Sequence, residues 1–184
     1  FDYFETFGGA VSPRTALIYT PFQKTTFKFV YGRAFREPNA FELYYGDPFQ
    51  IDNPNLDPET IDTYEIIYEQ YLGKYLRGTI VGFYNSINDF ISFTKEEDKG
   101  KFDNVDGVHA KGFEFELEGK HEFGFEGRVS YTIQEAEGGD SGDALANSPK
   151  HLANLNVIIP LIRRKLFLSG EEQYTSKRDT LENN

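Results

Sequence analysis

The chain has 184 residues, including 18 Phe and 12 Tyr but no Cys, Met or Trp. This length is sufficient for one domain, and the absence of cysteine excludes a disulfide-stabilised scaffold. A formal net charge of −11 argues against nucleic acid as a partner, because phosphates attract basic surfaces. No apolar run approaches the roughly 20 residues of a transmembrane helix, so any membrane crossing has to be made by strands.

Eight segments are predicted to be β-strands, because each is bounded by turn residues and lacks helical periodicity. In chain order they lie near residues 13–20, 25–35, 60–72, 75–93, 108–119, 126–136, 150–160 and 165–175. Short links alternate with long ones at about 36–59, 94–107 and 137–149. This sorting is typical of outer-membrane barrels. We therefore expect an all-β fold: an antiparallel up-and-down meander that forms an open sheet or a segment of a wider barrel.

Apolar and polar residues alternate within the strands, which predicts one apolar and one polar face. The expected apolar face contains Phe27, Phe29, Tyr31, Phe113, Phe115, Leu117, Val129, Tyr131, Ile133, Leu155, Val157 and Ile159. The expected polar face, lining a wet lumen, contains Glu114, Glu116, Arg128, Thr132, Gln134, Asn154 and Asn156. Segment 75–93 is ambiguous, because Val81 and Phe83 compete with Ile80 and Tyr84 for the apolar face. A soluble sheet with one solvated face alternates equally well, but the sorted loops and many aromatic residues favour a barrel in lipid.

The link at 36–59 is too long to be only a connection. It contains Phe41, Tyr44, Tyr45 and Phe49, and disordered segments rarely carry so many aromatic residues. We therefore expect this link to be ordered and functional.

Several motifs resemble the barrel of TonB-dependent outer-membrane receptors. They are Ser12-Pro13-Arg14, the run from Arg33 to Pro38, Glu42-Leu-Tyr44, Asn53-Pro-Asn-Leu56, Pro58-Glu59 and Tyr64-Glu65. The stretch from Asn104 to Glu116 is similar to that family's asparagine-glycine-glycine-x-glutamate motif. Glu37 departs from the pattern, since the family more often has a small residue before the proline.

The resemblance implies the outer membrane of a Gram-negative bacterium and a barrel of about 22 strands. Residues 1–184 would be a single partial barrel domain, cut in two outer loops, with the plug, the TonB-box segment, the early strands and the closing strands elsewhere. The implied function is TonB-dependent uptake of a ferric siderophore or a similar scarce solute. The implied partners are outer-membrane lipid, TonB and a small molecule such as a ferric chelate.

The candidate ligand-binding residues are Arg33, Arg36, Glu42, Tyr44 and Tyr45, because cations and flat rings suit an anionic aromatic chelate. An alternative is that the two arginines pair with carboxylates and hold the loop. Haem-uptake members carry a histidine between the two loop motifs, and this chain has none there, which disfavours haem.

No catalytic site, cofactor site or metal site is predicted. The histidines His109, His121 and His151 are not accompanied by a nucleophile elbow, a zinc pair or a phosphate loop. The acidic loop residues Glu135, Glu137, Asp140 and Asp143 miss the spacing of a calcium-binding EF-hand. The carboxylates Glu65, Glu69, Glu114, Glu116 and Glu118 are expected to pair with Arg or Lys of neighbouring strands or the plug. The second functional hypothesis is a soluble or surface-displayed β-domain that binds a partner through its long loops without transport.

Overall fold

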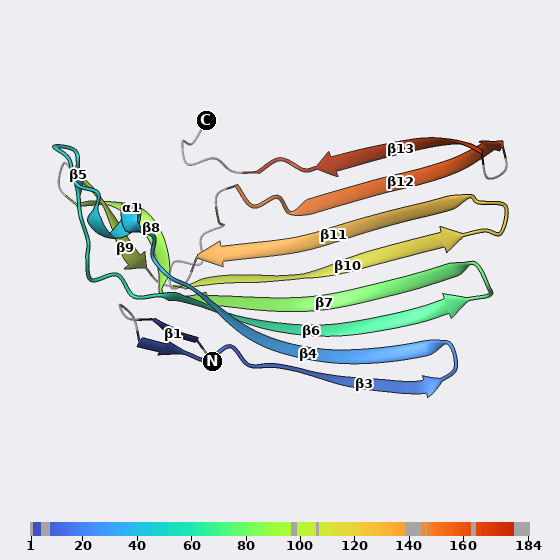
Figure 1. Ribbon diagram of the computed structural model, residues 1–184, viewed down its shortest axis with the longest axis horizontal. Coiled ribbons are helices and arrows are strands. Elements are labelled where there is room, and N and C mark those ends of the chain that lie inside the picture. Colours follow the sequence, from blue (N-terminus) through green and yellow to red (C-terminus); the bar gives the residue numbers. More distant parts are fainter. Residues whose placement is uncertain are drawn as a thin grey trace.

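Eight long strands form one antiparallel sheet in the computed structural model, which describes residues 2–4, 8–96, 99–105, 107–138, 145, 147–162 and 165–178. In sheet order the strands are β3 (Arg14–Phe22), β4 (Thr25–Arg36), β6 (Glu59–Leu72), β7 (Leu76–Asn88), β10 (Val108–Lys120), β11 (Glu126–Gly138), β12 (His151–Ile162) and β13 (Leu166–Thr175). Strands β3 and β13 are the two edges, so the sheet is open (Figure 1). The predicted up-and-down meander is confirmed.

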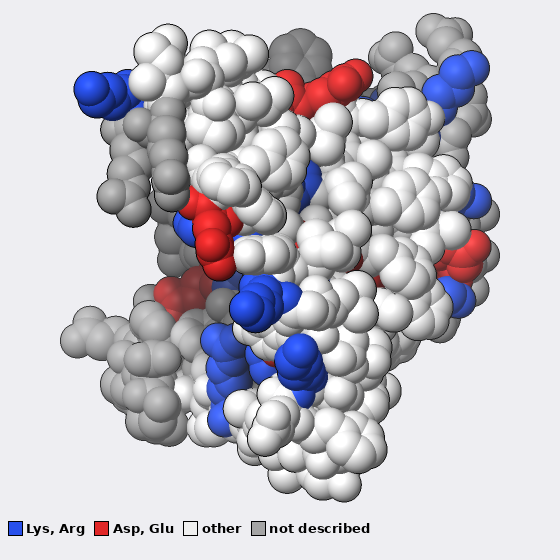
Figure 2. All heavy atoms as spheres, turned by 90° about the vertical axis from the view of Figure 1, so that its right-hand side faces the viewer, with Lys and Arg blue, Asp and Glu red and all other residues white. Residues whose placement is uncertain are grey.

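Short turns and long connections lie at opposite ends of the sheet (Figure 1). The β6–β7 turn shows why a short link suffices: Gly73 has a φ of 71°, which glycine adopts without steric cost. Figure 2 views the short-turn end, where basic and acidic side chains are interspersed with uncharged ones. The first and last strands of the sheet begin and end at the long-loop side (Figure 1).

The long connections contain further elements. A hairpin of β1 (Asp2–Phe4) and β2 (Gly8–Ala10) precedes the sheet. Helix α1 (Ala40–Tyr44) and β5 (Gln50–Ile51) lie between β4 and β6, and β8 (Phe90–Glu96) and β9 (Lys99–Val105) lie between β7 and β10. Strand β9 pairs with β8 in antiparallel and with β5 in parallel orientation, which gives a small second sheet.

The prediction of one strand over 75–93 is wrong. Strand β7 ends at Asn88, and Asp89 has a φ of 55°. Asp and Asn tolerate this left-handed conformation better than other residues with a side chain, so the chain leaves the sheet here and enters β8. The expected long loop at 94–107 is therefore largely the β8–β9 hairpin.

The strand register confirms the two predicted faces. One row runs through Phe27, Tyr68, Ile80, Phe115 and Tyr131, each opposite the next. All the residues expected on the apolar face share the side of this row, and those expected on the polar face lie on the other side.

The register also resolves the ambiguity in β7. Ile80 and Tyr84 lie on the apolar face, whereas Val81 and Phe83 lie on the polar face. The alternation was unclear because Gly78 and Gly82 occupy the apolar positions on either side of Ile80. The Phe113 ring lies over Gly82, where an added Cβ would be 3.3 Å from it.

The apolar face is exposed. Phe29, Ile66 and Phe113 have 45%, 57% and 56% of their surface accessible. Buried apolar side chains instead occur mainly in the long connections, at Leu43, Leu56 and Ile91, with Val108 at the start of β10. None of the described helices is long and apolar enough to span a membrane.

Candidate functional site

Helix α1 is short but well capped. The Asn39 side chain accepts hydrogen bonds from the backbone N–H groups of Phe41 and Glu42, and the Glu42 carboxylate accepts one from the backbone of Asn39 at 2.8 Å. This reciprocal pair is a capping box, which satisfies N–H groups that a helix leaves free at its start. The sequence analysis did not predict this helix. The Asn-x-x-Glu spacing of residues 39–42 was the signal in the sequence that could have revealed it.

The helix and the second sheet form one folded unit, which we call the loop module: residues 37–58 together with 89–105, of which 97 and 98 are not described. Leu43, Leu56 and Ile91 form its buried core, and Phe102 packs against them. Leu56 is only 2% exposed. The two long connections therefore fold on each other and form a small core of their own.

Two of the motifs that resemble the family, those that begin at Asn53 and at Asn104, each bind residues next to the other or at the end of β7 in this module. The Asn53 side chain donates to the carbonyl oxygen of Phe102 at 2.9 Å. The Asn104 side chain accepts from the Asp57 N–H at 2.8 Å and donates to the carbonyl oxygens of Asp57 and Asp89 at 3.0 and 2.7 Å. The asparagine side chains thus supply hydrogen bonds between the irregular segment 53–57 and strand β9, which is a structural role.

Arg36 joins the loop module to the sheet. At the end of β4, on the polar face, its guanidinium donates to both Glu59 oxygens, at 2.6 and 2.9 Å, and to the Glu42 carboxylate at 3.1 Å. Glu59 also accepts the backbone N–H of Ile91 at 2.7 Å. One arginine and two carboxylates therefore link β4, β6, α1 and β8, and the charge of Arg36 is compensated.

Arg33 lies on the opposite side of the sheet. It donates to both oxygens of Asp62, at 2.8 and 2.7 Å, and the Tyr31 hydroxyl donates to the same carboxylate at 2.8 Å. Arg33 shares the apolar face with Tyr31, whereas Arg36 is on the polar face. The structure therefore does not bring these two candidate residues together, and both take the carboxylate pairing that the sequence had left as an alternative.

The tyrosines of the candidate site are exposed on the loop module. Tyr44 is 61% accessible, and the rings of Phe41 and Tyr45 are stacked with centroids 4.5 Å apart. The Tyr45 hydroxyl donates to Asp47, which raises the pKa of Tyr45. The backbone N–H of Phe49 is the main cause that lowers the pKa of Asp47. Flat apolar surface is thus presented to solvent on an ordered turn.

The polar face of the sheet carries a network of ion pairs. Glu116 lies between two arginines, 3.7 Å from Arg77 and 3.2 Å from Arg128, and Arg77 also contacts Glu118 at 2.6 Å. Lys28 pairs with Glu69 at 2.7 Å. Three of the expected carboxylates therefore find partners on neighbouring strands. The Asn154 amide donates to Ser130 and the Gln134 amide donates to the Pro149 carbonyl oxygen.

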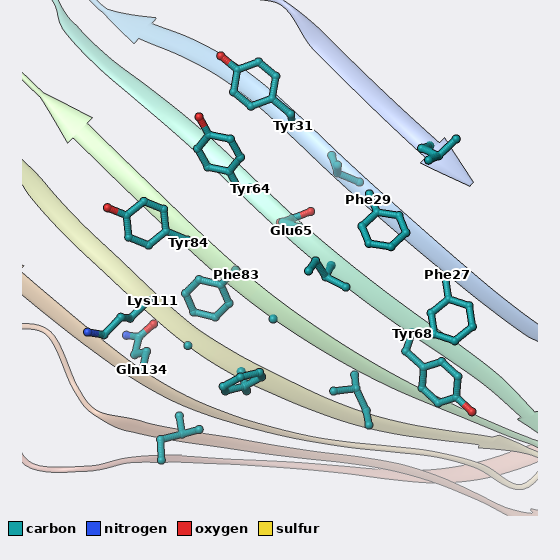
Figure 3. A pocket seen from close by; sticks show the side chains of 18 of the residues that line it. Phe27, Phe29, Tyr31, Tyr64, Glu65, Tyr68, Phe83, Tyr84, Lys111 and Gln134 are labelled. Atoms are coloured by element: carbon teal, nitrogen blue, oxygen red, sulfur yellow. The ribbon is translucent and has the colours of Figure 1, made fainter. Parts of the chain in front are cut away.

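Tyrosine hydroxyls point in opposite directions at the two ends of the apolar face. Figure 3 shows those of Tyr31, Tyr64 and Tyr84 directed toward the long-loop ends of their strands, and that of Tyr68 directed toward the short turns. The hollow of about 1080 Å³ in this view is a broad depression lined by these and neighbouring side chains. Rings that flank an apolar band with hydroxyls turned outward are the arrangement of membrane interfaces.

The histidines show no catalytic arrangement. His109 and His151 lie on the apolar face, with Nδ1 3.1 Å from the Tyr84 hydroxyl and 2.8 Å from the Tyr131 hydroxyl. The part of the chain that the structure describes contains no group of side chains that could hold a metal ion. Asp140 and Asp143 of the acidic loop lie outside the described residues.

Comparison with known proteins agrees with these features. Residues 1–177 match the family described as TonB dependent receptor-like, beta-barrel. The vitamin B12 transporter BtuB of Vibrio cholerae is 27% identical over 186 residues, which cover 100% of this chain and 29% of the transporter. The chain thus spans less than a third of this relative.

Solved structures share the fold at lower identity. The siderophore receptor PirA of Pseudomonas aeruginosa has a TM-score of 0.68 and 19% identity, over 93% of this chain and 35% of PirA. The hemophore receptor HasR of Serratia marcescens has a TM-score of 0.68 and 13% identity, over 89% of this chain and 32% of HasR.

The chain belongs to the TonB-dependent receptor β-barrel family. It is part of an outer-membrane protein of a Gram-negative bacterium. We therefore expect its exposed apolar face to be the one that contacts lipid. The family consists of receptors and transporters rather than enzymes.

Proposed function

We propose that this chain is one partial barrel domain of a TonB-dependent transporter that takes up a ferric siderophore or a comparable scarce solute. The observation that carries this proposal is the loop module, an ordered unit at the long-loop end that exposes Phe41, Tyr44 and Tyr45. Aromatic rings offer large, rigid contact surfaces at small entropic cost. In this proposal the plug, the remaining strands and the contact with TonB belong to parts of the protein outside residues 1–184.

The amino-acid composition limits the classes of solute that this part of the protein could bind directly. The loop module contains no histidine, and the whole chain contains no cysteine or methionine. These side chains are the ones that bind haem iron and soft metal ions directly. A chelated solute, contacted through its organic surface, therefore fits this part of the protein better than haem or a bare copper ion.

The arginines are assigned a positioning role in this proposal. Arg36 forms ion pairs with Glu59 and Glu42, so its positive charge is already compensated. Arg33 lies on the apolar face and forms an ion pair with Asp62. We infer that Arg36 holds the module in place and that Tyr44 and Tyr45 contact the solute.

The test uses the full-length protein in detergent, with ferric catecholate, ferric hydroxamate and cyanocobalamin as probes. Tyr44→Ala and Tyr45→Ala should each weaken binding of one probe by about tenfold or more, the loss typical of an aromatic anchor. Tyr71→Ala, which changes an exposed tyrosine near the short turns, is the matched control. Unchanged affinity for every probe in both tyrosine variants would refute the assignment.

A second pair of variants separates positioning from direct contact. If Arg36 acts through Glu59, Arg36→Ala and Glu59→Gln should both weaken binding and both make the loop module more sensitive to protease. Losing a charge-assisted bond of this kind costs about 1.5–3 kcal/mol. If Arg36 contacts the solute, only Arg36→Ala should weaken binding, and the module should remain protected.

A further inference from the structure

The net charge of the chain is concentrated at one end of the sheet. The eight strands and their short turns contain thirteen acidic and thirteen basic residues, so together they are neutral. The long connections, with the segments before β3 and after β13, contain seventeen acidic and six basic residues, which account for the whole formal charge of −11. We propose that the solute carries no net negative charge and is a neutral or cationic chelate. This inference rests on the proposed function and specifies the class of solute that the same site binds.

The acidic end is the end that a solute meets first. In outer-membrane barrels the long loops are extracellular and the short turns are periplasmic. The loop module alone contains ten acidic and three basic residues. A surface on which one sign of charge predominates repels solutes of the same sign over about a Debye length, roughly 8 Å at physiological ionic strength. A chelate with several negative charges is therefore disfavoured before it reaches the exposed aromatic rings.

The three basic residues of the loop module do not offset its negative charge. Lys101 forms an ion pair with Asp103 at 3.2 Å, so its charge is compensated. Lys95 and Lys99 flank three consecutive acidic residues at positions 96–98 in the sequence. Carboxylates therefore outnumber the lysines in each part of the module that carries a lysine.

The two arginines that had suggested an anionic chelate in the sequence are also compensated. Arg36 pairs with Glu59 and Glu42, and Arg33 pairs with Asp62. An anionic solute would have to take an arginine away from its carboxylate. A carboxylate left without its partner costs more free energy than an ordinary hydrogen bond contributes. The structure therefore removes the reason for expecting an anionic solute.

The exposed rings favour the same class of solute. The rings of Phe41 and Tyr45 are stacked with centroids 4.5 Å apart, and Tyr44 is 61% accessible. The face of an aromatic ring carries negative electrostatic potential and attracts cations. The Asp47 carboxylate accepts the Tyr45 hydroxyl at 3.1 Å and adds negative charge beside the ring. This surface suits apolar and positively charged groups of a solute together.

The experiment measures binding of matched probes to the full-length protein in detergent, at low ionic strength and without divalent cations. The first series is ferrioxamine B with its terminal amine free, acetylated or succinylated, which makes one ferric hydroxamate core cationic, neutral or anionic. The second series is cyanocobalamin and its monocarboxylic acid. Ferric enterobactin, a tris-catecholate, is the strongly anionic probe. In a series that binds, each step toward negative charge should weaken binding by about threefold or more, and the difference should shrink at high salt.

A pair of variants tests whether the acidic residues cause this preference. Asp52 and Asp57 are exposed on the loop module. Asp52→Asn/Asp57→Asn removes two charges at nearly constant volume, so it should strengthen binding of the anionic probe by about twofold to threefold. Binding of the neutral probe should stay unchanged. Asp52→Glu/Asp57→Glu is the matched control, because it keeps both charges and should leave the affinity for both probes unchanged.

Two results would overturn the inference and leave the proposed function intact. One is tighter binding of ferric enterobactin than of every neutral and cationic probe. The other is equal affinity at low ionic strength for all members of a series that binds. Both results come from the wild-type protein and need no variant to fold. Binding of none of the probes would refute the proposed function, and the inference with it.

Discussion

The eight-stranded sheet and the loop module place their apolar residues in opposite ways. In the sheet the large apolar side chains form an exposed face, as Phe29 and Phe113 show, whereas the opposite face carries ion pairs such as Arg77 with Glu118. In the module the apolar residues Leu43 and Leu56 are buried together. The sheet thus exposes its apolar side chains, contrary to the arrangement in soluble proteins, whereas the module buries them as a small soluble domain does.

The difference shows that the distribution of apolar residues in each region suits its surroundings, which are lipid for the sheet and water for the module. We expect lipid to cover the apolar face of the sheet, so that the sheet needs no second layer of protein, and its backbone groups are paired between strands. The module projects into water and has to exclude water by its own packing. The two regions meet at Arg36, Glu42 and Glu59, where the ion pairs described above join them. Substitutions on each side of this junction should therefore affect different properties.

The largest loss of stability is expected from a substitution in the core of the loop module. Leu56→Ala should lower the free energy of unfolding of the loop module by about 2–5 kcal/mol, because Leu56 is fully packed and its removal leaves a cavity. Protease cleavage within residues 37–58 should rise, while the heat resistance of the barrel on gels should stay unchanged. Phe49→Ala is the control, since Phe49 is 77% exposed. An equal loss of barrel heat resistance would mean that sheet and module unfold as one unit.

The second-largest loss of stability is expected when a charge is introduced on the apolar face of the sheet. Phe115→Arg should destabilise the barrel in lipid by about 2–4 kcal/mol if Phe115 lies near the middle of the bilayer. The measurement is urea unfolding in vesicles. Glu114→Gln on the polar face is the appropriate control, because Glu116 is held by Arg77 and Arg128 and its replacement would leave two cations unpaired. Similar losses for Phe115→Arg and Glu114→Gln would contradict the lipid-facing assignment.

Glu172 is a charged residue on the otherwise apolar face of the sheet. Its replacement is expected to have a smaller effect than Phe115→Arg and to stabilise the barrel. It lies opposite Leu155 on the apolar face of β13. Carboxylates on the lipid face cost less than the 2–4 kcal/mol of a midplane lysine or arginine, so Glu172→Leu should stabilise the barrel by less than about 2 kcal/mol. Urea unfolding in vesicles measures this change, with Glu171→Leu on the polar face as the control. A destabilised Glu172→Leu barrel would show that this carboxylate pairs with a cation from a neighbouring strand.

The smallest effect concerns pH and is confined to the module. The pKa of Asp47 is lowered from 3.8, chiefly by the backbone N–H of Phe49, so the unfolded turn binds a proton more readily than the folded one. The contribution of Asp47 is therefore complete above pH 3.8 and is lost as the pH falls through the lower folded value. The protection of the Phe49 and Gln50 amides, measured as the hydrogen-exchange rate relative to the intrinsic rate of an unfolded chain at the same pH, should fall at low pH, and Asp47→Asn should reduce this dependence. An unchanged pH profile in Asp47→Asn would exclude the carboxylate as its source.

The sequence determined the sheet almost completely. Strands with a period of two, short turns alternating with long links, and the residues on each face all follow from local alternation, because side chains of a strand point to opposite sides in turn. Alternation was ambiguous in β7, where glycines occupy two of the apolar positions and the ring that covers Gly82 is Phe113, a residue on another strand. It also breaks in β13, where Glu172 lies on the apolar face. The end of β7 was also missed, since Asn88 and Asp89 were not recognised as a break.

The tertiary structure decided the environment of the candidate site. Arg33 and Arg36 are three residues apart, so the alternation of β4 sends them to opposite faces, and the partners Asp62 and Glu59 are defined only once β6 is paired with β4. The core of the loop module joins Leu43 and Leu56 to Ile91, which belongs to a different connection. Local sequence specifies what each strand presents on either side, but contacts between distant segments depend on strand register and on packing, and these exist only in the folded chain.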